Sequence, residues 1–322
     1  NMIELLICNK RTGQIFSVAN CTQSITWETN RTGSPGTLNF KINKSGGLDF
    51  LEGDIVRFSE NGQLQFYGWV FTKSKNRWGE IEVTCYDRLR YLKANASYAF
   101  YNQTAGEILR QIAEDLEIET GMIEDTGYAI PSLIEEDQSC LDILESAIQQ
   151  TLLNTGRLFV LYDDGSGVPL RECANLISNV ILGTQSLLTE YTYKTDIDDQ
   201  VYNSVKLARP NEETGRASVY IAQDSYHIGR WGLLQLYQKV DEELNDAQIK
   251  ARAEETLAYY NRRRRSLSIS ALGVPGLRAG QLMLMQIPDL GDMDLDQYML
   301  IEQMTHTWEN DKHEMEIETR EF

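Results

Sequence analysis

The sequence has few of the residues on which enzymes and metal proteins depend. Its 322 residues include three histidines and five cysteines, and no two cysteines stand in a CxxC spacing. A structural zinc site needs several such ligands at short spacings, so we expect no zinc site and reduced, buried thiols. The motifs GxSxG, GxxxxGK[ST], GxGxxG and HExxH are also missing, which excludes the hydrolases, P-loop proteins and zincins that carry them.

Long apolar runs and excess positive charge are missing too. No run approaches the roughly 20 residues of a membrane-spanning helix. Residues 1–8 have neither the basic stretch nor the small-residue cleavage site of a secretion signal, so we expect no export by a signal peptide. With 48 acidic and 30 basic residues the formal charge is −18. This charge argues against nucleic-acid binding and against docking on an anionic membrane, because both need a basic face.

Charge and hydrophobic periodicity divide the chain into three expected domains. Residues 1–93 carry +3, residues 94–196 carry −13 and residues 197–322 carry −8. The first domain has several short alternating strands separated by glycine-containing turns, which indicates a small β-barrel or sandwich. The third returns to this pattern and adds one helix, 246–262, with Asn245 as its cap.

The middle domain changes to helical periodicity. Thr104 and Glu107 form a capping pair before one apolar helical face, and Ser139 and Asp142 repeat the arrangement before a second. A predicted hairpin follows at 157–173. The fold class we expect is therefore α+β, with two β-domains flanking an α/β insert domain.

The two β-domains also repeat each other in sequence. At an offset of 234, residues 65–70 align with 299–304 and residues 79–85 with 313–319. The strand that begins after a glycine upstream, 52–56, aligns with 279–283 at an offset of 227. A constant offset over a hairpin, preceded by a matching strand, indicates a duplication. The chain then presents the same kind of surface twice.

Two of the histidines form the first candidate for a reactive site. His306 and His313 stand seven residues apart across a predicted hairpin, with Asp311 between them. A metal site would need a third ligand and a cavity, so the pattern favours an ordinary surface hairpin.

Carboxylate groups form the other candidates. Asp292, Asp294 and Asp296 resemble the start of a calcium loop, but Gln297 and Gln303 stand where the loop needs glycine and glutamate. The run 135–137 lacks an apolar pocket that would raise the pKa of one carboxyl group for glycoside hydrolysis. Solvated loops are favoured in both places, and we expect no catalytic residue, no cofactor and no metal.

Four consecutive arginines, Arg262, Arg263, Arg264 and Arg265, follow the predicted helix. They are compatible with the last helical turn, where cations complement the helix dipole. They are equally compatible with a partner-binding contact, because arginine binds carboxylates through two parallel hydrogen bonds. Both interpretations stay open.

Several segments together carry a resemblance to a known family. Segments 52–58, 66–70 and 86–92, with 200–205, 245–253, 273–280 and 298–302, resemble the baseplate hub proteins of contractile phage tails. These are the late-control-D and XkdQ-like proteins, which are related to the hub part of VgrG spikes. The resemblance covers nearly the whole chain and is weakest over 94–196.

The resemblance implies a structural protein without enzymatic activity. The two β-domains would be tail-tube-like barrels, and a homotrimer would arrange six of them in a pseudo-sixfold ring. That ring would join the hexameric tail tube protein to the trimeric spike protein, with tape-measure and LysM-type baseplate proteins as further partners. The location implied is the baseplate of a virion or tail-like particle assembled in the bacterial cytoplasm. The alternatives are a tail-associated peptidoglycan hydrolase and a carbohydrate-binding tail module.

Overall fold

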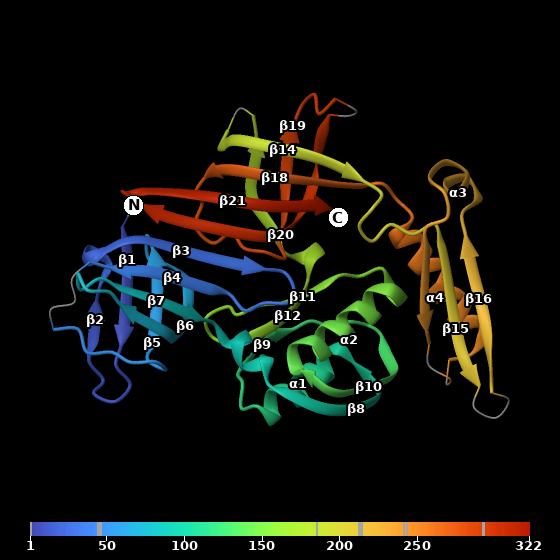
Figure 1. The fold of residues 1–322 in the computed structure, drawn as a ribbon, viewed down its shortest axis with the longest axis horizontal. Coiled ribbons are helices and arrows are strands. Elements are labelled where there is room, and N and C mark those ends of the chain that lie inside the picture. Colours follow the sequence, from blue (N-terminus) through green and yellow to red (C-terminus); the bar gives the residue numbers. More distant parts are fainter. Residues whose placement is uncertain are drawn as a thin grey trace.

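The computed structural model describes residues 2–43, 47–184, 186–211, 215–240, 242, 244–291 and 294–322. Within these residues strands predominate and helices are few (Figure 1). No described helix combines the length and the apolar character needed to cross a membrane.

The first β unit is built from the N-terminal part of the chain. Its strands are β1 (Ile3–Cys8), β2 (Ile15–Ser17), β3 (Thr22–Asn30), β4 (Thr37–Ile42), β5 (Ile55–Glu60), β6 (Gln63–Lys75) and β7 (Ile81–Tyr86). Alternate residues of these strands bury one apolar cluster, which includes Leu38, Phe58 and Val83. The other residues of the same strands are mostly polar, as expected for a sheet that is covered on one face.

The second β unit combines strands from the middle and the C-terminal part of the chain. They are β13 (Ile177–Gly183), β14 (Leu188–Asp196), β18 (Arg264–Leu272), β19 (Leu282–Ile287), β20 (Leu295–Glu309) and β21 (Lys312–Glu321). Their strand order, β14-β18-β21-β20-β19, matches the order β3-β4-β7-β6-β5 of the first unit. The units differ at the end of this order, because β1 pairs with β5 antiparallel whereas β13 pairs with β19 parallel.

The same backbone hydrogen bonds recur in both units and define which residues correspond. Gly53 N donates to Val70 O (2.7 Å) and Val70 N to Asp54 O (2.9 Å). In the second unit Gly280 N donates to Ile301 O (2.8 Å) and Ile301 N to Gln281 O (3.0 Å). The upstream offset of 227 is therefore confirmed, and Val70 corresponds to Ile301 at an offset of 231.

The sequence alignment of 65–70 with 299–304 at an offset of 234 is thus wrong by three residues. The first hairpin has 14 residues between Val70 and its partner Cys85, and the second has 17 between Ile301 and its partner Thr319, so the second hairpin is three residues longer. A short register shift follows Val70 in one hairpin and Ile301 in the other, which fixes the alignment on both sides of the turn. The offset of 234 holds for 79–85.

The insert lies beside the first β unit and contains two packed helices (Figure 1). Its elements are β8 (Asn95–Thr104), α1 (Ala105–Asp115), β9 (Thr120–Ile123), β10 (Ala129–Ser139), α2 (Cys140–Thr155), β11 (Phe159–Leu161) and β12 (Val168–Glu172). The capping box at Thr104 and Glu107 is present, and the Ser139 hydroxyl accepts a hydrogen bond from Asp142 N. Short 3-10 helices η2 (Arg88–Lys93) and η3 (Cys173–Asn175) connect the insert to its neighbours.

A fourth, smaller unit stands apart from the second sheet. It contains β15 (Ser204–Asn211), β16 (Arg216–Gln223), α3 (Ser225–Trp231), β17 (Gln235–Lys239) and α4 (Asp246–Tyr260), and it has its own apolar cluster. The helix expected at 246–262 ends at Tyr260 and packs on β15 and β16. The expected boundary between 196 and 197 does not coincide with the strand pairing, because β13 and β14 join the second unit and 204–260 do not.

Candidate assembly surfaces

The two β units share one continuous sheet, because β20 is long enough to pair twice. Its first half pairs with β19, and its second half, from Gln303 to Glu309, pairs antiparallel with Asn30 to Ser24 of β3. We call this pairing of β20 with β3 the joint between the two units. At its start Arg31 N donates to Glu302 O (2.9 Å), and the two side chains form an ion pair (2.8 Å). Figure 1 shows the resulting stack of strands from β14 at the top to β6.

A buried chain of three ionisable side chains lies beneath the joint. His306 Nε2 lies 2.8 Å from Leu277 O, His306 Nδ1 lies 2.8 Å from His313 Nε2, and His313 Nδ1 lies 3.0 Å from Glu60 Oε2. Trp27 and Trp308 stack on the His306 ring. The predicted hairpin is present, but the expectation that these histidines lie on its surface is wrong. Their strand positions alternate toward the core, and the first β unit covers them.

The hydrogen-bond partners of the two histidines show which ring nitrogens carry a hydrogen. A carbonyl oxygen only accepts, so His306 Nε2 carries a hydrogen and Nδ1 accepts from His313 Nε2. His313 Nδ1 lies 3.0 Å from Glu60 Oε2, and a proton between these two atoms is a prediction that Glu60→Gln tests. Burial lowers the pKa of His306 to about 4, and burial together with the nearby His306 lowers that of His313 to about 3. Both rings are therefore neutral at pH 7.

A second buried cluster ties the insert to both β units. Asp163 accepts hydrogen bonds from Arg88 N (2.9 Å) and Arg88 Nη1 (2.7 Å), while Arg278 Nη1 donates to the Asp163 carbonyl (2.7 Å). The Arg278 guanidinium also lies 4.0 Å from the centre of the Tyr162 ring. These contacts connect η2, the loop before β12 and the segment before β19.

The neighbouring Asp87 caps η2 and holds the loop before β4. Its carboxylate accepts from Leu89 N (3.0 Å) and Gly36 N (2.8 Å). A Cβ on Gly36 would lie 2.4 Å from Asp87 Oδ2, so glycine is required there. Burial and the nearby Asp163 charge raise the pKa of Asp87 to about 7. The hydrogen bonds that Asp87 accepts from Gly36 N and Leu89 N hold two backbone segments in place, so Asp87 has a structural role.

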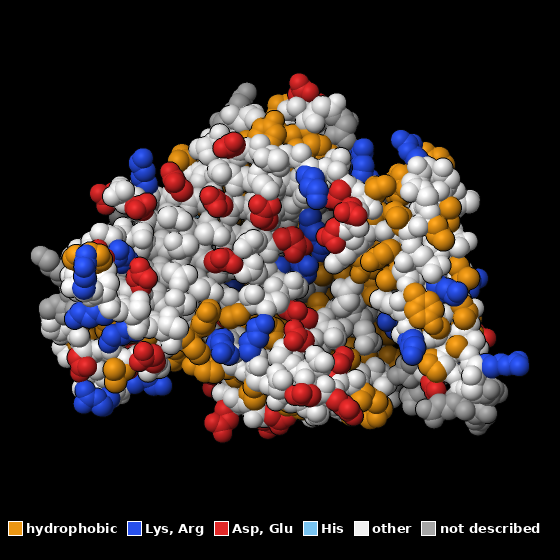
Figure 2. Space-filling view, in the orientation of Figure 1, with side chains coloured by type: hydrophobic (Ala, Val, Ile, Leu, Met, Phe, Trp, Pro, Cys, Tyr) orange, Lys and Arg blue, Asp and Glu red, His pale blue; other side chains and the backbone are white. Residues whose placement is uncertain are grey.

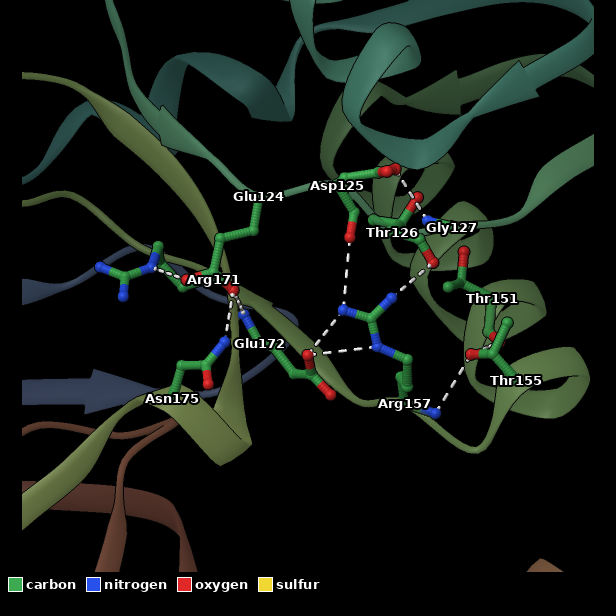
Figure 3. A network of polar contacts seen from close by, with 10 residues as sticks. All are labelled: Glu124, Asp125, Thr126, Gly127, Thr151, Thr155, Arg157, Arg171, Glu172 and Asn175. Carbon is green, nitrogen blue, oxygen red and sulfur yellow. Dashed lines mark hydrogen bonds and ion pairs between the residues drawn. The ribbon is translucent and has the colours of Figure 1, made fainter.

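Part of the insert's acidity is used internally (Figure 3). Glu172 binds Arg157 Nη2 (2.7 Å), and Arg157 Nη1 donates to Thr126 O (3.2 Å). Glu124 pairs with Arg171 and also accepts from Glu172 N (2.8 Å). Burial alone would raise the pKa of Glu124, but these hydrogen bonds lower it. The network fastens the loop after β9 to β12 and to the end of α2.

Among the described residues, β14 and the second half of β6 are strand edges that are open to a partner. Strand β14 is the last strand of the sheet order and pairs only with β18. Strand β6 pairs with β7 along its second half, and among the described residues no backbone hydrogen bond reaches its other side beyond Val70. Exposed edges of this kind pair readily with strands of another chain.

The four arginines leave α4 in different directions. Arg264 and Arg265 belong to β18 and form ion pairs with Asp199 (3.5 Å) and Glu321 (3.0 Å). Arg262 lies over the Tyr259 ring at 5.3 Å. Arg262, Arg263 and Arg265 also line a cleft of about 670 Å³ together with Arg230, Tyr226, Trp231, Tyr298 and Phe322. A contact with a partner therefore stays a prediction, and Arg262 and Arg263 are the residues best placed for it.

The long sheet has one face on which most side chains around the joint are polar, with Leu272 as an exposed apolar residue at its margin. Its outward residues are mainly serine, threonine, asparagine, glutamine and glutamate, with Lys41 and Lys194 among them, and Figure 2 shows acidic side chains spread across it. The exposed glutamates on this face are Glu82, Glu190, Glu314, Glu316 and Glu318. The aspartates of the calcium-like run are held locally instead. Asp294 accepts from Asp289 N (2.8 Å) and Asp296 from Gln286 (3.0 Å), while Asp292 lies outside the described residues.

Solved structures share this arrangement of units. A tail protein from Neisseria meningitidis superposes with a TM-score of 0.75 at 12% identity, covering 100% of this chain and 97% of that one. The 43 kDa tail protein of prophage MuSo2 from Shewanella oneidensis gives 0.72 at 15% identity, covering 99% and 98%. The c3393 protein of Escherichia coli, a component of a type VI secretion system, gives 0.55 at 12% identity, covering 92% and 73%. The chain thus has the fold of phage tail proteins.

Sequence relatives narrow this class to one family. The YqbQ-like family model matches residues 25–320, and the chain belongs to this family. YqbQ of Bacillus subtilis is 33% identical over 99% of this chain and 97% of its own length. XkdQ of the phage-like element PBSX, from the same species, is 32% identical over the same shares. The resemblance to XkdQ-like proteins is confirmed.

Sequence reasoning missed the residues that hold the units together. Glu60 stands in an ordinary alternating strand, and Asp163 and Arg278 lie 115 residues apart. The Asp87-Arg88 pair was visible within the segment 86–92 that carries the resemblance, but its partners were not.

Proposed function

We propose that this chain is the central hub of a contractile phage tail or tail-like particle, and that it resides in the baseplate. Three copies form a ring in which each β unit is one of six similar barrels. One side of the ring binds the hexameric tail tube protein and the other binds the trimeric spike protein. The chain acts as a structural adaptor and carries out no reaction.

One observation carries this proposal: two β units with the same strand order lie edge to edge in one sheet. Two similar units per chain turn a threefold assembly into a ring with six similar positions. The XkdQ-like relatives and the fold of phage tail proteins support the same conclusion.

The acidic face of the sheet fits the inside of such a ring. The apolar clusters of both units lie behind the strands, so the face with Glu82, Glu190 and Glu316 is left for a channel. A wall of mainly small polar and negative side chains repels polyanions and gives other cargo little apolar surface to bind.

Mixing experiments with the tail tube and spike proteins of the same particle test this function. Native mass spectrometry should detect complexes with three copies of this chain, about 110 kDa of hub, and electron microscopy should show a ring with six similar lobes. Six copies of this chain per tube ring, or no association with either protein, would overturn the proposal. Clearing of cell walls by the purified chain would favour the hydrolase instead, and glycan binding by a monomer would favour the carbohydrate-binding module.

A further inference from the structure

The two strands of the joint, β20 and β3, have unpaired counterparts in the second half of β6 and in β14. We propose that the second half of β6 pairs antiparallel with β14 of a neighbouring copy of this chain. This inference rests on the ring proposed above and adds the strands and the register that close it.

The correspondence between the units identifies the two edges. Because Val70 corresponds to Ile301, residues 72–75 of β6 correspond to 303–306 of β20, the stretch that pairs with β3. Strand β14 corresponds to β3, since both occupy the same place in the matching strand orders. The chain therefore contains each half of the joint twice, and one copy of each half is already paired.

The paired copy also supplies the register. Tyr193 lies opposite Leu267 in β18 as Trp27 lies opposite Leu38 in β4, so β14 follows β3 at an offset of 166. Within the chain Thr305 pairs with Glu28 and His306 with Trp27. The equivalent pairs between chains, listed in order along β6, are Thr72 with Asp196, Lys73 with Thr195, Ser74 with Lys194 and Lys75 with Tyr193.

Charge supports this pairing. Residues 71–77 carry three basic side chains and no acidic one, whereas 188–199 carry four acidic side chains and one lysine, so the edges have charges of +3 and −3. Opposite charges across an interface raise the association rate and disfavour wrong partners. In this register Lys75 meets the Tyr193 ring, where His306 stacks on Trp27 within the chain, and a cation over a tyrosine ring is a favourable contact.

The two edges cannot meet within one chain. Six strands separate β6 from β14 in the sheet order, so the edges lie roughly 30 Å apart at the usual strand spacing. A head-to-tail contact between unlike edges generates a ring when its rotation closes. Eight strands per chain, from β14 to β6, would give a ring of 24 strands in the trimer.

Disulfide trapping tests the register directly. Arg31 and Glu302 form a hydrogen-bonded pair, so Thr305–Glu28 and its counterpart Ser74–Lys194 are non-hydrogen-bonded pairs, in which side chains come closest. The chain with Ser74→Cys and Lys194→Cys should form covalent dimers and trimers under mild oxidation, which reducing agent reverses. Glu28→Cys with Thr305→Cys is the matched positive control, because it should close a disulfide within one chain.

The negative control moves one cysteine along the strand. Ser74→Cys with Glu190→Cys places the sulfur atoms about 13 Å apart in the proposed register, which is beyond the reach of a disulfide. Each single variant detects homotypic cross-linking. We expect at least tenfold more covalent trimer from the in-register pair than from any control, at matched protein concentration.

The outcomes separate this inference from the ring itself. Trimers by mass spectrometry without selective cross-linking would overturn the register and leave the hub function standing. No cross-linking, with the chain alone or with the tube and spike proteins present, would overturn edge pairing altogether. Selective cross-linking supports the inference whether or not the isolated chain is a stable trimer, because a disulfide also captures a transient contact.

Discussion

Replacing Glu60 with glutamine tests the proton count of the buried chain beneath the joint. The hydrogen bonds from His306 to Leu277 and between His306 and His313 account for two protons. Because His313 Nδ1 lies 3.0 Å from Glu60 Oε2, we expect a third proton between these two atoms in the folded cluster. Glutamine has the same size and its amide donates to His313 Nδ1, so it keeps the hydrogen bonds and removes the titrating group.

The magnitude follows from proton linkage. Above about pH 7 the unfolded chain holds two protons on these groups, one on each neutral imidazole, while the folded cluster holds three. Wild-type stability from this cluster therefore falls by about 1.4 kcal/mol for each pH unit. In Glu60→Gln both states hold two protons, so this slope disappears. Between pH 6.5 and 8.5 the variant should gain about 2.5 kcal/mol relative to the wild type.

The acid side of the profile serves as an internal control. The pKa values of His306, about 4, and His313, about 3, lie below the ordinary value of 6.5. Neutral histidines therefore stabilise the fold above pH 6.5, and this stability is lost as pH falls toward 4. At pH 5 the loss is about 4 kcal/mol for the two rings, in wild type and variant alike.

Urea unfolding followed by tryptophan fluorescence at half-unit pH intervals measures both sides, since Trp27 and Trp308 flank the cluster. Parallel stability curves for the two proteins between pH 6.5 and 8.5 would refute the proton assignment. A variant that is less stable at every pH by a constant amount would show instead that Glu60 is ionised and that its charge is needed.

Three further predictions concern the joints and the arginine run. Gly273→Ala should cost about 2–4 kcal/mol, because its Cβ would lie 2.0 Å from His313 Cγ, whereas Gly229→Ala, with nothing within 4 Å, should cost nothing in thermal or urea unfolding. Asp163→Asn should cost about 3 kcal/mol by weakening a buried ion pair, against less than about 1 kcal/mol for Asp49→Asn in the exposed pair with Arg11; equal losses would contradict this. Arg262→Glu with Arg263→Glu should weaken binding to a tail partner at least tenfold without changing the melting temperature, and Lys250→Glu on the exposed face of α4 should leave binding unchanged.

The parts of the fold that depend on local chemistry could be predicted from the sequence. The capping box at Thr104 and the cap at Asn245 begin α1 and α4 where expected, because a side chain and a backbone only three residues away decide them. The alternation of Glu80, Ile81 and Glu82 likewise gave the buried side of β7. Such signals need no knowledge of the rest of the chain.

Features that depend on distant pairing could not be predicted. The acidic composition of 94–196 grouped β14 with the insert, whereas its partner β18 begins about 70 residues later. The alternation of His306 and His313 was visible, but only the first β unit determines that the turn is covered. The offset error in β6 has the same origin, since a three-residue change in a turn leaves the alternating pattern of each strand intact and reverses which face it predicts.

The charge of −18 is divided between two uses that the composition cannot separate. In the insert, Glu124 and Glu172 bind arginines and backbone N–H groups and so contribute to its rigidity. On the long sheet, Glu316 and Glu318 are exposed on the same face of β21, and Glu318 accepts a hydrogen bond from the Ser268 hydroxyl (2.6 Å). Neither forms an ion pair among the described residues, so their mutual repulsion disfavours the folded chain. Within the proposed ring the acidic wall would therefore come from the β units, and a trimer structure would test whether carboxylates of the insert also face the channel.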